Sequence, residues 1–210
     1  MYRFVIAALL VASVKGQLVL EGPCNFAATT AVRNLNVSEF LGEWQQIARI
    51  PSADDVGDCA SSTYEGVVTN GVLVNGTIFN RQVVNRTVQW VNGTFSAGDN
   101  GVYIFRYPAG AMNVLVLATD YTGYGLLYSC EQNTTHRTVW SWQISRAKQF
   151  TTEQSNLINT AITLNTDLRN ATWRAVGHTA EHCKTNSAIS ILASPIILAL
   201  VLCNMLSFLS

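Results

Sequence analysis

The stretch YEGVVTNGVLVNGTIF, residues 64–79, contains two runs of strand-forming residues separated by the pair Asn70-Gly71. Valine, isoleucine, tyrosine and phenylalanine suit the pleated surface of a strand, whereas asparagine and glycine tolerate the positive φ of a tight turn. An Asn-Gly pair between two such runs is typical of a type I′ β-hairpin. The stretch therefore predicts two antiparallel strands joined by a short turn.

The same pattern continues on both sides of this hairpin. Asn92-Gly93 and Asn100-Gly101 are further turn pairs that divide later runs. The runs predict eight strands, over 42–51, 60–69, 72–80, 83–95, 101–107, 112–119, 124–131 and 137–145. Eight is the number of strands that closes an up-and-down barrel able to hold one small ligand. We therefore expect an all-β fold with an eight-stranded antiparallel up-and-down barrel.

One α-helix is expected to follow the last barrel strand. Residues 151–154, TTEQ, have the pattern of a capping box, in which the first and fourth residues cap the first helical turn. Apolar residues then recur at helical spacing, which indicates a face that packs on the barrel. That face consists of Leu157, Ala161, Leu164 and Leu168, with Ile158 and Ile162 beside it. A short strand is expected at 173–176.

Charged side chains are scarce in this chain. They make up 12% of the 210 residues, 13 basic and 13 acidic, where a typical soluble protein has about 25%. The shortage lies largely at the ends, because no charged residue follows Lys184 and only Arg3 and Lys15 precede Glu21. Zero formal charge without a basic run argues against a nucleic-acid partner and against adhesion to an anionic membrane surface.

Both ends of the chain have the patterns of processed segments. Residues 1–16 combine Arg3 with an apolar run, which is typical of a cleaved secretory signal peptide. Residues 187–210 end in an apolar tail that follows small residues, as in the signal for a glycosylphosphatidylinositol (GPI) anchor. We expect GPI attachment at Asn186 to the outer leaflet of the plasma membrane, with a retained transmembrane helix as the alternative. The mature extracellular domain is then 17–186.

The cysteines agree with a secreted protein. Cys203 lies in the tail, and an even number in the mature domain implies two disulfides, for which three pairings exist. His178 and His182 stand near the last of these cysteines, but no Cys-x-x-Cys spacing occurs and a metal site is not expected. The cysteines of the mature domain are Cys24, Cys59, Cys130 and Cys183.

Six Asn-x-Ser/Thr sequons predict N-glycosylation. Glycans are bulky and hydrophilic, so each occupied asparagine has to point to solvent. Together they would hydrate a surface that has few charges. The sequons are at Asn36, Asn75, Asn85, Asn92, Asn133 and Asn170.

Three separated motifs resemble those of the lipocalins. The first is Phe40-Leu41-Gly42-Glu43-Trp44, which matches the Gly-x-Trp of the first barrel strand in that family. The second is Thr119-Asp120-Tyr121, between two strands, and the third is Arg146, after the last one. Within the family, 117–121 and 126–130 most resemble apolipoprotein D, the bilin-binding proteins and Lazarillo. The resemblance covers essentially the whole mature chain and implies a lipocalin barrel with one C-terminal helix packed on it.

The resemblance also implies structural roles. Trp44 would close one end of the barrel, with the Arg146 guanidinium stacked over its ring in a cation–π contact worth about 1–2 kcal/mol. The family pattern selects the disulfides Cys24–Cys130 and Cys59–Cys183 from the three possible pairings. Both would tie the terminal arms to the barrel.

A ligand pocket is expected inside the barrel. Side chains alternate between the two faces of a strand. If Arg106 faces solvent, the side chains at 103, 105 and 107 therefore face the barrel interior. The resemblance implies that Trp142 and Tyr64 line the pocket and that Phe79 occupies a pocket position. Thr77 and Arg81 are polar residues on the same face as Phe79. The alternative is that these aromatic side chains only fill a narrow core. The expected ligand-binding residues are Tyr64, Thr77, Phe79, Arg81, Tyr103, Phe105, Tyr107 and Trp142.

The resemblance implies an extracellular binder of a small hydrophobic molecule, such as a lipid, retinoid, steroid or bile pigment, with no other cofactor. The alternative is a neuronal cell-surface recognition glycoprotein that is similar to Lazarillo. It would contact a protein partner and use the barrel as a scaffold. One lipocalin branch isomerises prostaglandins through a free thiol. An enzyme is not expected here, because all four mature cysteines should be bonded and no Gly-x-Ser-x-Gly setting occurs.

Overall fold

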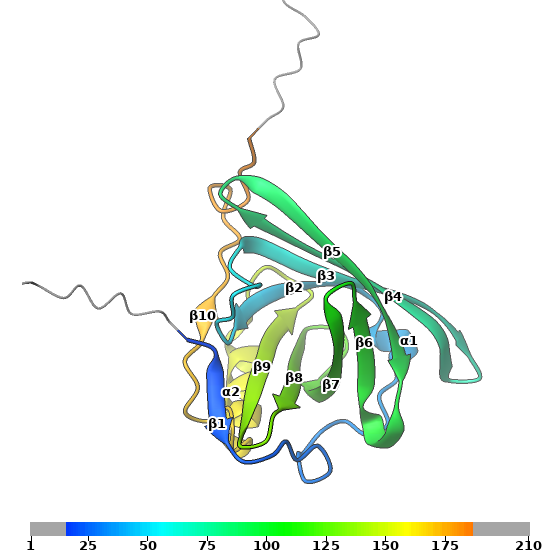
Figure 1. The fold of residues 1–210 in the computed structure, drawn as a ribbon. Helices are drawn as coiled ribbons and strands as arrows, with labels where there is room; N and C mark the ends of the chain where they lie inside the picture. Colours follow the sequence, from blue (N-terminus) through cyan, green and yellow to red (C-terminus); the bar gives the residue numbers. More distant parts are fainter. Residues whose placement is uncertain (1–15, 187–210) are drawn as a thin grey trace, which may run out of the picture.

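The structure is a computed structural model that describes residues 16–186. The predicted signal peptide up to residue 15 and the predicted anchor signal at 187–210 lie outside the described residues. The described chain is dominated by one antiparallel sheet that curls into a barrel (Figure 1). The barrel strands are β2 (Gly42–Arg49), β3 (Asp58–Thr69), β4 (Val72–Val84), β5 (Thr87–Ala97), β6 (Tyr103–Tyr107), β7 (Gly110–Thr119), β8 (Tyr124–Gln132) and β9 (His136–Ser145).

Each barrel strand pairs with the next along the chain, and β9 returns to pair with β2. That last pairing closes the barrel, as the eight predicted runs require. Five smaller elements lie around it: β1 (Leu18–Glu21), α1 (Val37–Phe40), the 3₁₀ turn η1 (Asp99–Gly101), α2 (Thr152–Leu164) and β10 (Arg174–Ala175). β1 extends the sheet beside β9, and β10 pairs with β2. Within residues 16–186, no helix has the length and apolar character needed to cross a membrane.

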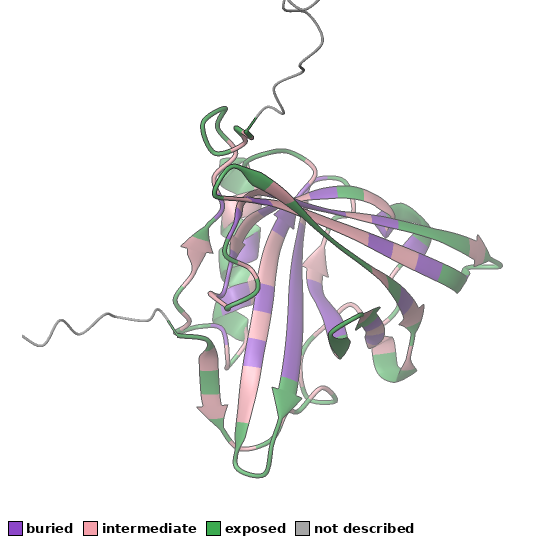
Figure 2. Cartoon of the chain, turned by 45° about the horizontal axis from the view of Figure 1, so that its top comes forward, coloured by how far each residue is buried: buried purple, intermediate pink, exposed green. Residues whose placement is uncertain are grey.

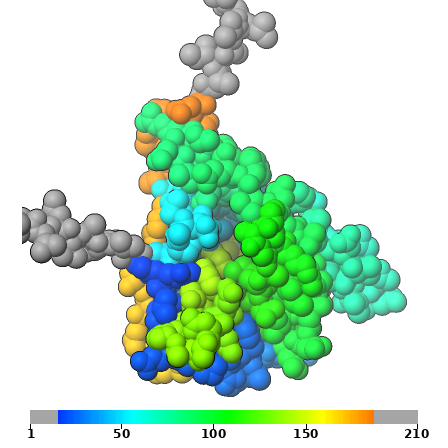
Figure 3. Space-filling model, viewed as in Figure 1, coloured from blue at the N-terminus to red at the C-terminus, as the bar shows by residue number. Residues whose placement is uncertain are grey.

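The turn prediction is right at Asn70-Gly71 and Asn100-Gly101 and wrong at Asn92-Gly93. Asn70 and Gly71 have φ values of 52° and 78°, as a type I′ turn requires. Their hairpin projects from one side of the barrel (Figure 3). Asn92-Gly93 instead lies inside β5, and β4 runs on to a turn at Asn85-Arg86, with φ values of 50° and 62°. Gly93 is required for packing, because a Cβ there would lie 2.5 Å from the carbonyl oxygen of Arg106.

Helix α2 begins as predicted. The Thr151 hydroxyl accepts a hydrogen bond from the backbone N–H of Gln154, and the Gln154 side chain accepts one from the backbone N–H of Thr151. This capping box satisfies two of the N–H groups that a helix start leaves without partners. The cap therefore sets where the helix starts, one residue after Thr151.

The prediction of the apolar face of α2 is wrong: the face that packs on the barrel is rotated about the helix axis relative to the predicted one. Ile158 and Ile162 are buried, whereas Leu157 is 45% exposed and Leu164 is 72% exposed. Leu168 is also buried, but it lies beyond the end of the helix. The buried isoleucines pack in one cluster with residues of β7 and β8. β8 is consequently buried on both faces, by the barrel interior and by α2 (Figure 2).

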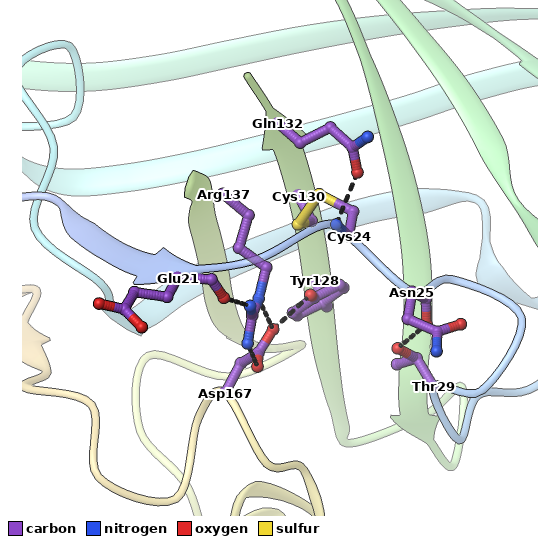
Figure 4. Close-up of a disulfide and its surroundings, with 9 residues drawn as sticks. All are labelled: Glu21, Cys24, Asn25, Thr29, Tyr128, Cys130, Gln132, Arg137 and Asp167. Carbon is purple, nitrogen blue, oxygen red and sulfur yellow. Dashed lines mark hydrogen bonds and ion pairs between the residues drawn. A yellow bond between two sulfur atoms is a disulfide. The ribbon is translucent and has the colours of Figure 1, made fainter. Parts of the chain in front are cut away.

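Two disulfides and three ion pairs, Arg86–Glu181, Arg137–Asp167 and Arg174–Asp58, attach the terminal arms to the barrel. Cys24 is bonded to Cys130 and Cys59 to Cys183, the pairings implied by the family resemblance. Near the first, Asp167 accepts hydrogen bonds from Arg137 at 2.7 Å and from the hydroxyl of Tyr128 at 2.8 Å (Figure 4). Burial by itself would raise the pKa of Asp167, but these hydrogen bonds outweigh it and lower that pKa. Asp167 is therefore a carboxylate at neutral pH.

One end of the barrel is closed by a stacked pair. Trp44 is completely buried, and the Arg146 guanidinium carbon lies 3.8 Å from the centre of its ring. The Trp44 indole N–H donates to the carbonyl oxygen of Phe40 at 2.8 Å. Arg146 also donates hydrogen bonds to five backbone carbonyls, those of Glu39, Phe40, Leu41, Glu43 and Tyr121.

The turn at 119–124 presents one of those carbonyls. Asp120 Oδ1 accepts hydrogen bonds from the backbone N–H groups of residues 122, 123 and 124. The Thr119 hydroxyl donates to the carbonyl oxygen of Tyr124 and accepts from the N–H of Tyr121. These contacts hold Tyr121 at φ 67° with its carbonyl oxygen 3.1 Å from Nε of Arg146. Gly42, at φ 99°, leaves room for the guanidinium, because a Cβ there would lie 3.2 Å from Nη1 of Arg146. Residues of all three motifs thus serve the closed end.

We predict that Ile158→Ala lowers the free energy of unfolding by about 2–5 kcal/mol, because it leaves a cavity between α2 and the barrel. Leu164→Ala removes an exposed side chain from the same helix and should change that free energy by less than about 0.5 kcal/mol. Urea unfolding followed by circular dichroism measures both. Equal losses for the two variants would show that the helix packs through the face first predicted from the spacing.

We predict that Arg146→Lys lowers the free energy of unfolding by about 2 kcal/mol or more. Lysine keeps the charge but loses the planar stack on Trp44 and cannot reach five carbonyl oxygens. The control is Arg86→Lys, whose ion pair with Glu181 is exposed and should contribute less than about 0.5 kcal/mol. A loss for Arg146→Lys no larger than for this control would contradict the proposed closure.

Candidate ligand-binding site

Above the closed end, aromatic rings fill the barrel. Phe40, Tyr64, Phe95 and Phe105 are packed with ring centres 5.4–6.0 Å apart. Tyr103 joins them through Phe95 at 6.5 Å. In this half of the barrel the alternative expectation, that the aromatic side chains form a core, is correct. Tyr103 belongs to that core and does not line the open half.

The other half of the barrel contains a cavity of about 310 Å³. Its wall includes five of the predicted ligand-binding residues, Tyr64, Arg81, Phe105, Tyr107 and Trp142. The remaining wall combines apolar with polar and charged side chains. It is formed by Gln46, Arg49, Ser52, Asp54, Asp55, Ala60, Ser62, Asn80, Gln82, Gln89, Val91, Ala109, Met112, Leu127, Trp140 and Ile144.

The prediction that Thr77 and Phe79 lie in the pocket is wrong. Tyr64 faces the interior and is paired with Ile78, which is completely buried. Directly opposed residues share a face, so the neighbours of Ile78 along β4 point outward. Arg81 is on this outward face too, but it lies near the open end, where its long side chain lines the cavity and donates to the carbonyl oxygen of Cys59 at 3.0 Å.

A β-bulge brings one unpredicted residue, Arg49, into the site. Gln46 of β2 is paired with Ile144 of β9, and Ala48 is paired with the adjacent Gln143. Ile47 is therefore an extra residue in β2 without a partner on β9. The bulge reverses the alternation, so that Arg49 shares the interior face with Gln46 although the two are three residues apart. No turn residue or unusual composition marks this bulge in the sequence.

Arg49 is completely buried but has no carboxylate partner among the ion pairs of the described residues. Its guanidinium donates to Gln46 Oε1 at 2.7 Å and to the carbonyl oxygen of Gly57. Burial lowers the pKa of this guanidinium, and the nearby Asp55 opposes that effect. Asp55 itself accepts a hydrogen bond from the indole N–H of Trp142 at 2.9 Å. Trp142 therefore offers the cavity its ring and not its N–H.

The interior polar groups form a hydrogen-bonded chain. The Ser62 hydroxyl donates to Asn80 Oδ1 at 2.7 Å, and Asn80 Nδ2 donates to the hydroxyl oxygen of Tyr107 at 3.1 Å. Burial raises the pKa of Tyr107 to about 12 and also raises that of Tyr64. Both phenols are therefore neutral at physiological pH, and the aromatic part of the wall carries no negative charge.

Outside the barrel, the side chains of Cys59, His178 and Cys183 lie within 4.8 Å of one another. The two sulfurs are joined in a disulfide, so the group offers only the histidine nitrogens as metal ligands. The six sequon asparagines are all exposed. Asn186, the predicted anchor site, is exposed as well and donates its backbone N–H to the carbonyl oxygen of Arg86.

No protein-family model matches the chain. Among curated relatives it is similar to apolipoprotein D of Cavia porcellus, with 28% identity over 127 residues, which cover 58% of this chain and 64% of that protein. It is also similar to apolipoprotein D of Macaca fascicularis, with 24% identity over 161 residues, which cover 74% and 83%. The match to the first relative thus spans just under two thirds of its length.

Among solved structures, the chain resembles insecticyanin from the tobacco hornworm Manduca sexta, with a TM-score of 0.70 and 19% identity over 81% of this chain and 94% of that one. Lobster apocrustacyanin A1 gives a TM-score of 0.63 and 18% identity over 78% and 93%. These structures have the same fold. The closed barrel with its single packed helix matches the lipocalin fold, and the three motifs and the similarity to apolipoprotein D support the lipocalin family.

Proposed function

We propose that this protein binds one small hydrophobic molecule in the barrel cavity. The observation that carries the proposal is the cavity itself: about 310 Å³, in which aromatic and aliphatic side chains line the wall together with polar and charged ones. That volume lies at the lower end of the range of about 300–1,000 Å³ that is usual for ligand pockets. It suits a retinoid, a steroid or a single-chain lipid better than a larger molecule.

The chemistry of the wall supports the same function. Leu127, Met112 and Ile144 present aliphatic groups between the rings, so an apolar ligand would leave water on entry. The four cysteines of residues 16–186 form two disulfides, which argues against a thiol nucleophile in the barrel. We therefore propose binding and transport and not catalysis.

We predict 1:1 binding of at least one of retinol, palmitic acid, a steroid or biliverdin by isothermal titration calorimetry. Met112→Trp should weaken binding at least tenfold, because it places a larger side chain in the cavity wall. The matched control is Thr77→Trp, which adds a larger side chain to β4 on the outward face and should leave affinity unchanged. Absence of binding for all four ligands would contradict the proposal, and so would equal affinities for the two variants.

The protein is further proposed to act outside the cell, as a glycosylated and GPI-anchored protein. The two disulfides suit an oxidising compartment. The exposure of every sequon asparagine would allow glycosylation at each site. Asn75 lies directly opposite Val67, which is 61% exposed, so a glycan there would cover apolar surface. Anchoring rests on the small residues and apolar tail at 186–210.

We predict that phosphatidylinositol-specific phospholipase C releases the full-length protein from the surface of animal cells, because a GPI anchor is held through its lipid alone. Western blotting of the medium measures the release. A chain that ends at Asn186 serves as the control and should be secreted without the enzyme. Full-length protein that stays with the cells after phospholipase treatment and is solubilised only by detergent would instead indicate a transmembrane helix.

A further inference from the structure

The hydrogen-bonded chain in the cavity has a direction. Ser62 and Asn80 are directly opposed on β3 and β4, and Tyr107 ends β6 on the other side of the cavity wall. Ser62 donates a hydrogen bond to Asn80, and Asn80 donates one to Tyr107. The chain therefore ends on a phenol whose oxygen already accepts a hydrogen bond.

A phenol has one proton, and that proton cannot point at the amide that donates to its oxygen. Within residues 16–186, the Tyr107 hydroxyl proton has no acceptor in any side-chain or backbone hydrogen bond of the structure. A donor left without an acceptor in an apolar cavity is unfavourable. Because Tyr107 stays protonated at physiological pH, it remains a donor throughout the range in which the protein works.

Several polar groups of the wall are already engaged. The indole N–H of Trp142 donates to Asp55. Arg81 donates to the carbonyl oxygen of Cys59. Tyr107 thus keeps a hydroxyl proton that a ligand can accept, and the buried Nε–H of Arg49 is a second donor of the wall without a partner in the described residues.

We propose that Tyr107 selects ligands that carry a carbonyl oxygen on an apolar body, and that Asn80 is the positioning residue that aims its hydroxyl. The inference rests on the proposed binding function and narrows it. Ketones, aldehydes, esters and carboxylic acids share the required acceptor, whereas a hydrocarbon of the same shape would leave the Tyr107 proton without a partner.

Two matched ligand pairs test this inference by calorimetry. They are 5α-androstan-17-one against 5α-androstane, and 2-hexadecanone against hexadecane. At least one ketone should bind roughly 3- to 10-fold more tightly than its hydrocarbon, the ratio expected for one hydrogen bond. Tyr107→Phe should abolish that preference. Asn80→Ala should reduce it, and Tyr124→Phe, which removes a hydroxyl outside the cavity, should preserve it.

Infrared spectroscopy of a ¹³C-carbonyl ketone distinguishes a hydrogen bond from a change of shape. The carbonyl stretch should shift to lower wavenumber in the complex with the original protein and return toward its apolar-solvent value in Tyr107→Phe. Equal binding within both pairs, or equal weakening of ketone and hydrocarbon by Tyr107→Phe, would overturn the inference while the binding function stands. If neither pair binds and the four ligands of the earlier titration also fail, the function itself fails and the inference with it.

Discussion

The stacking of Arg146 on Trp44 is the contact on which the rest of the structure depends. Trp44 lies on β2 and Arg146 follows β9, the two strands whose pairing closes the barrel. One guanidinium also gathers five backbone carbonyls from α1, β2 and the 119–124 turn. Because this pair and the aromatic core above it fill one end, the main cavity inside the described barrel lies toward the opposite end. The ligand cavity is a consequence of that asymmetry.

Once the barrel is closed, register decides which side chains meet a ligand. A shift of one residue exchanges the two faces of a strand. The pairing of Tyr64 with Ile78 turns Thr77 outward, and the bulge in β2 turns Arg49 inward. The same register sets Ser62 opposite Asn80, which begins the hydrogen-bonded chain that ends at Tyr107. This part of the polar chemistry of the cavity is therefore set by strand pairing.

Features that depend on neighbouring residues could be predicted from sequence, and those that depend on distant contacts could not. The turn at Asn70-Gly71 and the cap at Thr151 are local, and both are present. Gly93 looks like a turn residue in sequence, but it is a glycine because β6 passes too close for a side chain. The face of α2 was misassigned because β7 and β8 select Ile158 over the equally apolar Leu157. The disulfide pairing came from family resemblance, since three pairings were possible.

The central claim is that an apolar molecule occupies the half of the barrel opposite Trp44. The most direct measurement is native mass spectrometry of the protein purified from its own tissue without lipid extraction, followed by denaturation and absorbance spectroscopy of the released material. One small, apolar molecule per chain should be released when the barrel unfolds, with a visible absorption band if it is a pigment. A chain that carries no small molecule, and takes none up when offered an extract of the same tissue, would contradict the claim.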